Sequence, residues 1–263
     1  MNVYDLDGKV EKSIELPEAF SSGYREDLVR RALLAEQSLE YQPQGHDVMA
    51  GLRTTAVYVG NYKSYRTGRH MGIAIRPRQK LGGGAQGDVR RIPSATKGRR
   101  AHPHKIEKTI VERINNREYV RAVFAAISGC RESEAIKERH RFKGDAPIII
   151  DQKIEGVSKT KQLMQILEKL GVSDDLDASH KPRLANGMRR KAQLRHFRRS
   201  VLIVAKDASK ISKAGRNIPG VEVCSVSELT IQKLAPGGMP RLSVWSENSL
   251  ADVKASVEKM RLR

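Results

Sequence analysis

The chain has 263 residues and a formal net charge of +19, so a polyanion is the expected partner, nucleic acid first and an anionic membrane second. No apolar run approaches the roughly 18 residues of a membrane span, and the N-terminal residues lack the apolar core of a signal peptide. The two cysteines are too few for a disulfide framework. We therefore expect a reduced, cytoplasmic protein that does not cross a membrane.

The basic excess lies in two segments, which we call the first and second basic blocks. Residues 41–108 hold 14 basic and 3 acidic residues, and residues 180–199 hold 8 basic residues and no acidic one. The blocks contribute +11 and +8, which accounts for the whole net charge of +19. A solvated charged surface is the alternative, but a neutral body that carries two cationic segments favours polyanion binding.

Outside the blocks, apolar patterns alternate between those of strands and those of helices. In chain order they predict a strand at 2–8, helices at 25–40 and 107–128, a buried strand at 147–151, a helix at 158–171, buried strands at 201–207 and 220–226, a short helix at 227–234, a strand at 241–246 and a helix at 247–260. Strands separated by helices predict a single α/β domain over residues 1–263 with a mainly parallel sheet.

Several residues are predicted to begin or end these helices. Ser21 or Ser22 suits the N-cap of the first helix, and Ser249 with Asp252 forms a possible capping box for the last. A left-handed C-terminal glycine is expected at Gly129, and Gly171 is expected to stop its helix.

Residues 42–105 do not fit the layered pattern. They contain ten glycines and almost no apolar periodicity after residues 72–75. A structureless stretch of this length inside a domain indicates a functional segment or one that orders on a partner. We therefore predict an extended basic loop, inserted in the domain, that is disordered without its partner.

The loop contains Gly82, Gly84 and Gly87 in the G-x-G-x-x-G spacing of a dinucleotide-binding turn. Such a turn must come after a buried strand and open a helix, but here RPRQKL precedes the glycines and Pro93 interrupts the residues after them. The P-loop lysine and hydroxyl are also missing, since Asp88 comes directly after Gly87. The sequence argues against a nucleotide site and favours glycines that let the backbone approach RNA phosphates.

The loop favours arginine over lysine by nine to five, as expected where a guanidinium forks to a phosphate or stacks on a base. Tyr58, Tyr62 and Tyr65 could stack on unpaired bases or pack at the root of the loop. The candidate RNA ligands of the first block are Arg53, Tyr62, Lys63, Arg66, Arg69, His70, Arg76, Arg78, Lys80, Gly82, Gly83, Gly84, Gln86, Arg90, Arg91, Lys97, Arg99, Arg100, His102, His104 and Lys105.

The second block is predicted to be a short helix or a basic loop beside the sheet. Its candidate RNA ligands are Arg183, Arg189, Arg190, Lys191, Arg195, Arg198 and Arg199.

No catalytic constellation stands out. His102 and His104 have no cysteine or carboxylate pair at zinc spacing, so no metal and no cofactor are expected. Cys130 and Cys224 fit small core residues. Asp151 and Asp207 end buried-type strands, where turn and cap roles are favoured over acid catalysis. A nucleotide-dependent α/β enzyme and a free-standing RNA chaperone or regulator remain the alternative functions.

The sequence resembles the universal large-subunit ribosomal protein four family in its archaeal form. The resemblance rests on residues 66–108 (RTGRHMGIAIRPRQKLGGGAQGDVRRIPSATKGRRAHPHKIEK), INNREYVRAVFAAIS, VLIVAKD, RNIPGVEV followed by LAPGG, and RLSVWSENSL. It covers nearly the whole chain.

The resemblance implies a Rossmann-like α/β body without a nucleotide site, no enzymatic activity, and a long internal loop that penetrates the large ribosomal RNA. It implies a role in subunit assembly, with rRNA and neighbouring large-subunit proteins as partners. It also implies that the loop tip, near Met71–Arg91, helps form the narrow part of the exit tunnel and meets the nascent peptide transiently. The tunnel-lining candidates are Met71, Arg76, Arg78, Gly82 and Gly83.

Overall fold

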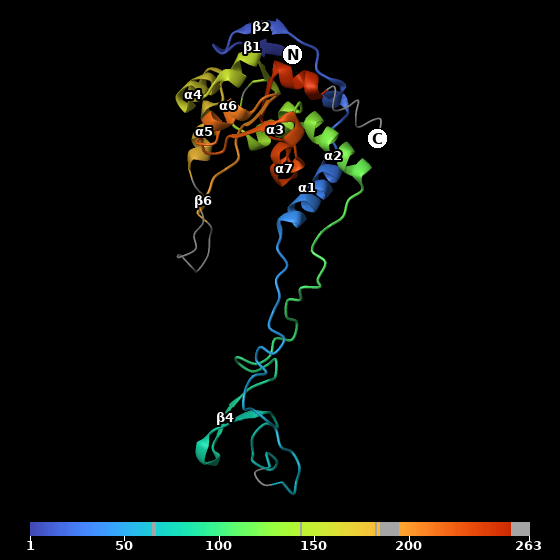
Figure 1. Ribbon diagram of the computed structural model, residues 1–263, viewed down its shortest axis with the longest axis vertical. Coiled ribbons are helices and arrows are strands. Elements are labelled where there is room, and N and C mark those ends of the chain that lie inside the picture. The colour runs from blue at the N-terminus through green and yellow to red at the C-terminus, as the bar shows by residue number, and fades with distance from the viewer. Residues whose placement is uncertain (65–66, 143, 182, 185–194, 254–263) are drawn as a thin grey trace. The chain divides into compact units, whose positions relative to one another are not determined.

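The computed structural model describes residues 1–64, 67–142, 144–181, 183–184 and 195–253 (Figure 1). Two compact units are present. The first, which we call the body, comprises Met1–Glu40 and the described part of Val111–Arg263. The second, the loop unit, comprises Tyr41–Ile110.

The body is built on a six-stranded sheet in the order β2-β1-β5-β10-β8-β9. Only the edge strand β2 is antiparallel to its neighbour, so the predicted mainly parallel α/β sheet is confirmed. The strands are β1 (Asn2–Tyr4), β2 (Val10–Ser13), β5 (Ile148–Ile150), β8 (Leu202–Ala205), β9 (Glu222–Ser225) and β10 (Ser243–Ser246).

Helices surround this sheet (Figure 1). The α-helices are α1 (Glu26–Glu40), α2 (Asn116–Gly129), α3 (Ser133–Arg139), α4 (Thr160–Lys169), α5 (Ser173–His180), α6 (Ser209–Gly215) and α7 (Ile231–Leu234), and residues 247–253 are also helical. Short 3-10 turns occupy η1 (Glu18–Ser21), η3 (Gln152–Gly156), η5 (Val226–Glu228) and η6 (Pro236–Gly238).

Two hydrophobic cores lie on opposite faces of the sheet, because neighbouring strand residues point to opposite sides. Ile149 and Trp245 belong to one core, together with side chains of α1, α2 and α7. Ile148 and Val244 belong to the other, together with side chains of α3, α4, α5 and α6. Burial on both faces explains why the parallel strands read as continuous apolar runs in the sequence.

Several predicted boundaries are wrong. The helix expected at 107–128 begins only at Asn116, so Ile110 and Ile114 lie outside it. The final helix can be followed to residue 253, where Leu250 and Val253 are buried as expected. The sequence also predicts Val257 and Met260 on the apolar face of this helix, but both lie outside the described residues.

Gly129 is another correction. It is the last residue of α2 and not a left-handed cap. A Cβ there would stand 2.7 Å from Cδ2 of Tyr24, so the glycine permits close packing of that ring. Gly171 does have the positive φ (+78°) expected of a helix stop.

The predicted capping residues at both ends of the chain are also wrong. Helix α1 begins at Glu26, beyond Ser21 and Ser22. At the last helix Ser246, not Ser249, is the N-cap, and its Oγ accepts the amide of Ser249, the third residue of the helix, at 3.2 Å.

Candidate nucleic-acid interface

A β-hairpin organises the glycine-rich part of the loop unit. Strands β3 (Arg78–Lys80) and β4 (Gln86–Val89) pair antiparallel, and η2 (Gly82–Gly84) forms the turn between them. Gly83 has φ +69°, which L side chains rarely adopt. No helix comes directly after the glycines, so the G-x-G-x-x-G spacing belongs to a hairpin and not to the strand–turn–helix unit of a dinucleotide-binding fold.

The turn is open on its outer side. A Cβ added at Gly82 or Gly83 would meet nothing within 4 Å, whereas one at Gly87 would lie 3.2 Å from Gln79 Cβ. Gly87 therefore serves the close pairing of the strands, while the first two glycines leave bare backbone accessible to a ligand. Gln86 reaches from β4 to Met71, with Nε2 at 3.4 Å from Sδ.

A cavity of about 320 Å³ lies beside the hairpin, with Arg76, Arg78, Lys80 and Tyr58 among its lining residues. The guanidinium of Arg78 is half-buried there: Nη2 donates to the carbonyl of Ala74 at 3.4 Å. Its Nε is buried and has no hydrogen-bond partner among the described residues. A buried donor of this kind needs an acceptor, which a phosphate or base oxygen would supply.

Most predicted RNA ligands of the first block are exposed. Arg53 is one of them but forms an ion pair with Asp47 at 2.9 Å. Arg66 lies outside the described residues, and the burial of Gly84 is not described. The exposed candidates are Arg53, Tyr62, Lys63, Arg69, His70, Arg76, Lys80, Gly82, Gly83, Gln86, Lys97, Arg99, Arg100, His102, His104 and Lys105.

Two predicted ligands serve the fold of the loop unit itself. Arg90 pairs with Asp88 at 3.0 Å and donates to the carbonyl of Thr96 at 2.6 Å. Arg91 donates from Nε to the carbonyl of Leu52 at 3.3 Å. These two guanidinium groups hold loop segments together, so fewer of their donors remain for RNA.

The tyrosines of the loop unit divide between the two expected roles. Tyr58 packs on glycines, since a Cβ at Gly60 would lie 2.7 Å from its Cε1. Tyr62 is 71 % exposed and meets only the edge of His70 among described rings, with centroids 6.3 Å apart. Exposure keeps Tyr62 available for base stacking, whereas Tyr65 lies outside the described residues.

The second basic block contains two short antiparallel strands near its ends, β6 (Arg183–Leu184) and β7 (Arg195–His196). The backbone of Arg183 is opposite His196, and that of Leu184 is opposite Arg195. Arg189, Arg190 and Lys191 lie outside the described residues, so the choice between a short helix and a loop is open for them.

Arg198 and Arg199, at the end of the second block, contact acidic groups of the body. Arg198 Nη2 lies 3.4 Å from Asp175 Oδ1, and Arg199 Nε lies 3.5 Å from Glu222 Oε1. Arg199 also donates to the carbonyl of Gln232 at 2.9 Å. The Arg198 side chain is 22 % exposed and the Arg199 side chain is 38 % exposed, so part of each guanidinium-bearing side chain faces solvent.

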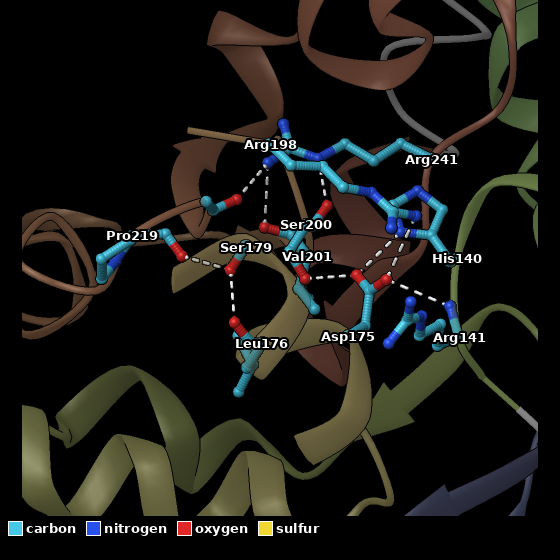
Figure 2. A network of polar contacts seen from close by, with 11 residues as sticks. His140, Arg141, Asp175, Leu176, Ser179, Arg198, Ser200, Val201, Pro219 and Arg241 are labelled. Atoms are coloured by element: carbon cyan, nitrogen blue, oxygen red, sulfur yellow. Dashed lines mark hydrogen bonds and ion pairs between the residues drawn. The ribbon is translucent and has the colours of Figure 1, made fainter. Parts of the chain in front are cut away.

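Asp175 is the centre of the polar network that holds Arg198 (Figure 2). The buried carboxylate accepts from His140 Nδ1 at 2.9 Å, from the amide of Arg141 at 3.1 Å and from the hydroxyl of Ser200. Burial alone would raise the pKa of Asp175, but these hydrogen bonds outweigh it and hold the pKa well below its ordinary value. The aspartate is therefore a fixed negative charge beneath the second block.

The remaining candidate chemistry fits structural roles. Cys130 and Cys224 are fully buried, and burial raises their pKa values to about 11 and about 12. Asp207 accepts the amide of Ser209 at 3.0 Å, which is the hydrogen bond of an Asx turn just before α6. Asp151 precedes η3 and pairs with Lys153 at 3.0 Å.

Within the described part of the chain, no group of three or more histidine, cysteine or carboxylate side chains is placed to hold a metal ion. Nor is any described helix both long and apolar enough to cross a membrane.

Sequence reasoning missed Arg139, which lies beside Arg198 and Arg199 in a pocket of the body. It belongs to α3, a helix of seven residues that the apolar pattern did not reveal. Phe197 in the same pocket was also missed, although an aromatic residue inside the run RHFRR is a usable signal for stacking.

The sequence of the chain is similar to those of known ribosomal proteins. The sequence model of the ribosomal protein L4/L1 family matches residues 14–256. The chain is 38 % identical to large ribosomal subunit protein uL4 of Methanocaldococcus jannaschii, over 97 % of this chain and 98 % of the relative. Identity is 37 % to the uL4 of Methanococcoides burtonii (96 % and 97 % covered) and 35 % to that of Haloarcula marismortui (95 % and 97 %). The chain belongs to the ribosomal protein L4/L1 family.

Proposed function

We propose that the protein is a structural constituent of the large ribosomal subunit in the cytoplasm, where it binds large-subunit rRNA and supports subunit assembly. The proposal rests on the exposure of the loop unit in a chain of the ribosomal protein L4/L1 family. Among the described residues of this unit, only Ala56 has a buried side chain. Its fourteen basic residues face only three acidic ones. The family is structural, and the protein is not an enzyme.

The exposed arginines and lysines of the loop unit are the proposed phosphate ligands. Their charges repel one another, and surrounding phosphates remove that repulsion. The open backbone at Gly82 and Gly83 lets an RNA strand approach the hairpin turn closely. On this proposal the domain is a single α/β body with residues 42–105 inserted as an RNA-binding loop.

The hairpin region is also the proposed contribution to the exit tunnel. Met71 is 48 % exposed and lies against Gln86 of β4, and Arg76 is exposed. Together with Arg78, Gly82 and Gly83 these residues are the proposed tunnel wall, and a nascent peptide is a transient partner. Neighbouring large-subunit proteins are further proposed partners.

Co-sedimentation with large subunits and a salt titration of rRNA binding test the main proposal. If about ten cations meet phosphate, log affinity falls against log salt with a slope of roughly −7 to −9. Added nucleotide should change nothing. A salt-insensitive affinity contradicts the proposal, and RNA binding without co-sedimentation indicates a free-standing chaperone instead.

Photo-crosslinking tests the tunnel. A benzophenone amino acid at Met71 should crosslink to a stalled nascent chain in intact ribosomes. Ile106, which is 67 % exposed in the same unit, is the matched control position and should not. Equal crosslinking at both positions, or none at Met71, rejects the tunnel assignment and leaves rRNA binding standing.

A further inference from the structure

A pocket of about 430 Å³ on the body lies where the second basic block rejoins the sheet. Its lining includes Arg139 of α3, the consecutive residues Phe197, Arg198 and Arg199, and Gln232 and Gly237. It is separate from the hairpin of the loop unit, since every lining residue belongs to the body.

The pocket has more positive than negative charge. Arg198 pairs with Asp175, while Arg199 and the buried Arg241 share Glu222. Arg139 donates to the carbonyl of Pro236, and no ion pair joins it to a carboxylate within the described residues. Arg139, Arg198 and Arg199 line the pocket and its described lining contains no carboxylate, so an excess of positive charge is left there that an anionic ligand would neutralise.

The electrostatic environment of Arg139 also reflects this excess of positive charge. Burial lowers the pKa of its guanidinium, and the charges of Arg241, Arg198 and Arg199 lower it further. Crowded, half-buried guanidinium groups of this kind are typical of phosphate recognition, because a bidentate fork fits phosphate oxygens.

Phe197 adds a second recognition element. The residue is 47 % exposed and lines the pocket together with Arg198 and Arg199, which come directly after it in the sequence. An exposed aromatic face next to cationic groups is the arrangement on which a nucleic-acid base stacks while its phosphate is held.

Gly237 lines the pocket next to Arg139. Its φ of +81° disfavours any side chain, so glycine is required there by the backbone.

We propose that this pocket is a second RNA site on the body, in which Arg139 and Arg199 hold a phosphate and an unpaired base stacks on Phe197. The site deepens the proposed rRNA-binding function and rests on it. RNA is favoured over an acidic peptide because the pocket combines a stacking ring with forked donors and continues the second basic block.

A crosslink from position 197 tests the contact directly. A benzophenone amino acid replaces Phe197 in the full-length protein, which is then bound to an in vitro transcript of the large-subunit rRNA. We expect one main crosslink, mapped by reverse transcription to an unpaired nucleotide. A crosslink only to another ribosomal protein in intact subunits, or no RNA crosslink from a complex that forms normally, overturns the proposal.

Two variants separate the stacking contact from the phosphate contact. Phe197→Ala should weaken binding to the transcript about tenfold without changing the salt slope. Arg139→Gln should weaken binding and reduce the slope by about 0.7 to 0.9, and Arg139→Lys should restore the slope. Thermal unfolding of each variant reports whether the body remains folded.

Matched controls are Leu34→Ala, an exposed apolar residue of α1, and Arg216→Gln, an exposed arginine after α6. Both should bind like the wild type. If the folded Phe197→Ala and Arg139→Gln proteins also bind like the wild type, this inference fails while rRNA binding stands. If the wild-type protein itself does not bind the transcript, the proposed function fails.

Discussion

The body and the loop unit differ in what determines their conformation. In the body, Ile148 and Ile149 point into two separate apolar cores, and both faces of the central strands are covered. In the loop unit, Ala56 is the one buried side chain among the described residues. Apolar burial therefore accounts for the stability of the body, whereas we predict that the loop unit needs its partner for most of its order.

The same difference separates two kinds of arginine. Arg241 in the body is fully buried and donates to the carbonyls of Ser200, Val201 and Gly220 at 2.5 to 3.2 Å. Arg76 and Arg99 in the loop unit are exposed. Buried guanidinium groups thus connect parts of the body, and the exposed ones are the proposed contacts with RNA.

Amide hydrogen exchange of the isolated protein should show the largest contrast. The amides of Val204 and Trp245 should exchange only on global unfolding, with protection factors at least ~10³ higher than those of residues 42–105. Addition of rRNA should slow exchange in the loop unit. Strong protection of residues 42–105 without RNA would show that the loop unit is stable alone.

Deletion of residues 66–100 should remove RNA affinity and spare the body. The segment contains ten basic residues and one acidic residue. We expect rRNA binding to fall by roughly 10³-fold at moderate salt, because most phosphate contacts are lost. Cooperative thermal unfolding of the body should persist, since its apolar cores lie elsewhere.

A full-length control separates the effect of the lost charges from the effect of the lost polypeptide segment. Replacing the same ten basic residues by glutamine should weaken binding as much as the deletion does. If the glutamine protein binds like the wild type, shape and not charge carries the interaction. If the deletion instead abolishes cooperative unfolding, the two units are not independent.

The sequence was most informative where a single physical requirement determined the residues. The run Ile148–Ile150 and the strand Leu202–Ala205 were predicted because burial on both faces requires continuous apolar residues. The basic blocks were evident because their excess equals the whole net charge.

What the sequence did not reveal depends on distant contacts. Helix α5, Ser173–His180, is polar in sequence, and its Asp175 is satisfied by His140 and Ser200 from other elements. Arg139 acquires its neighbours Arg198 and Arg199 only in the folded body. Such long-range polar networks have no local periodicity and therefore leave no signal in the sequence.

Arg241→Met should destabilise the body strongly while keeping the volume of the side chain. It removes the guanidinium donor from the carbonyls of Ser200, Val201 and Gly220 and from the carboxylate of Glu222, which keeps only its longer contact with Arg199 at 3.5 Å. We expect the free energy of unfolding to fall by roughly 2–3 kcal/mol, because hydrogen bonds from a charged donor to buried acceptors are lost. Chemical denaturation measures the loss.

Arg90→Ala in the loop unit is the matched control. Arg90 also forms an ion pair and a carbonyl hydrogen bond, but within the loop unit. Its effect on unfolding of the body should stay within about 0.5 kcal/mol, as for substitutions outside a core. A large effect of Arg90→Ala would show that the body and the loop unit unfold together.

The smallest expected effect is a dependence of body stability on pH through His140. Burial lowers the pKa of this imidazole, despite the opposing attraction of Asp175, and the charges of Arg139 and Arg198 lower it further. The buried Nε2 has no hydrogen-bond partner in the described part of the chain, so a proton there would be unsatisfied, and the neutral ring donates from Nδ1 to Asp175. The unfolded chain, with an ordinary value near ~6.5, therefore takes up the proton first as the pH falls.

Because the folded pKa lies below the unfolded one, the contribution of His140 is complete above pH ~6.5 and is lost as the pH falls toward the folded pKa. The slope reaches at most about 1.4 kcal/mol per pH unit for one proton. The lowered pKa of Asp175 adds a further loss only below pH ~3.9. His140→Gln retains a donor for Asp175 and should flatten the curve between pH 7 and 5, whereas substitution of the exposed His104 should leave it unchanged. Urea unfolding at a series of pH values measures the free energy of unfolding of each variant. If its slope against pH in His140→Gln equals that of the wild type, the pH dependence comes from groups outside the polar network of Asp175.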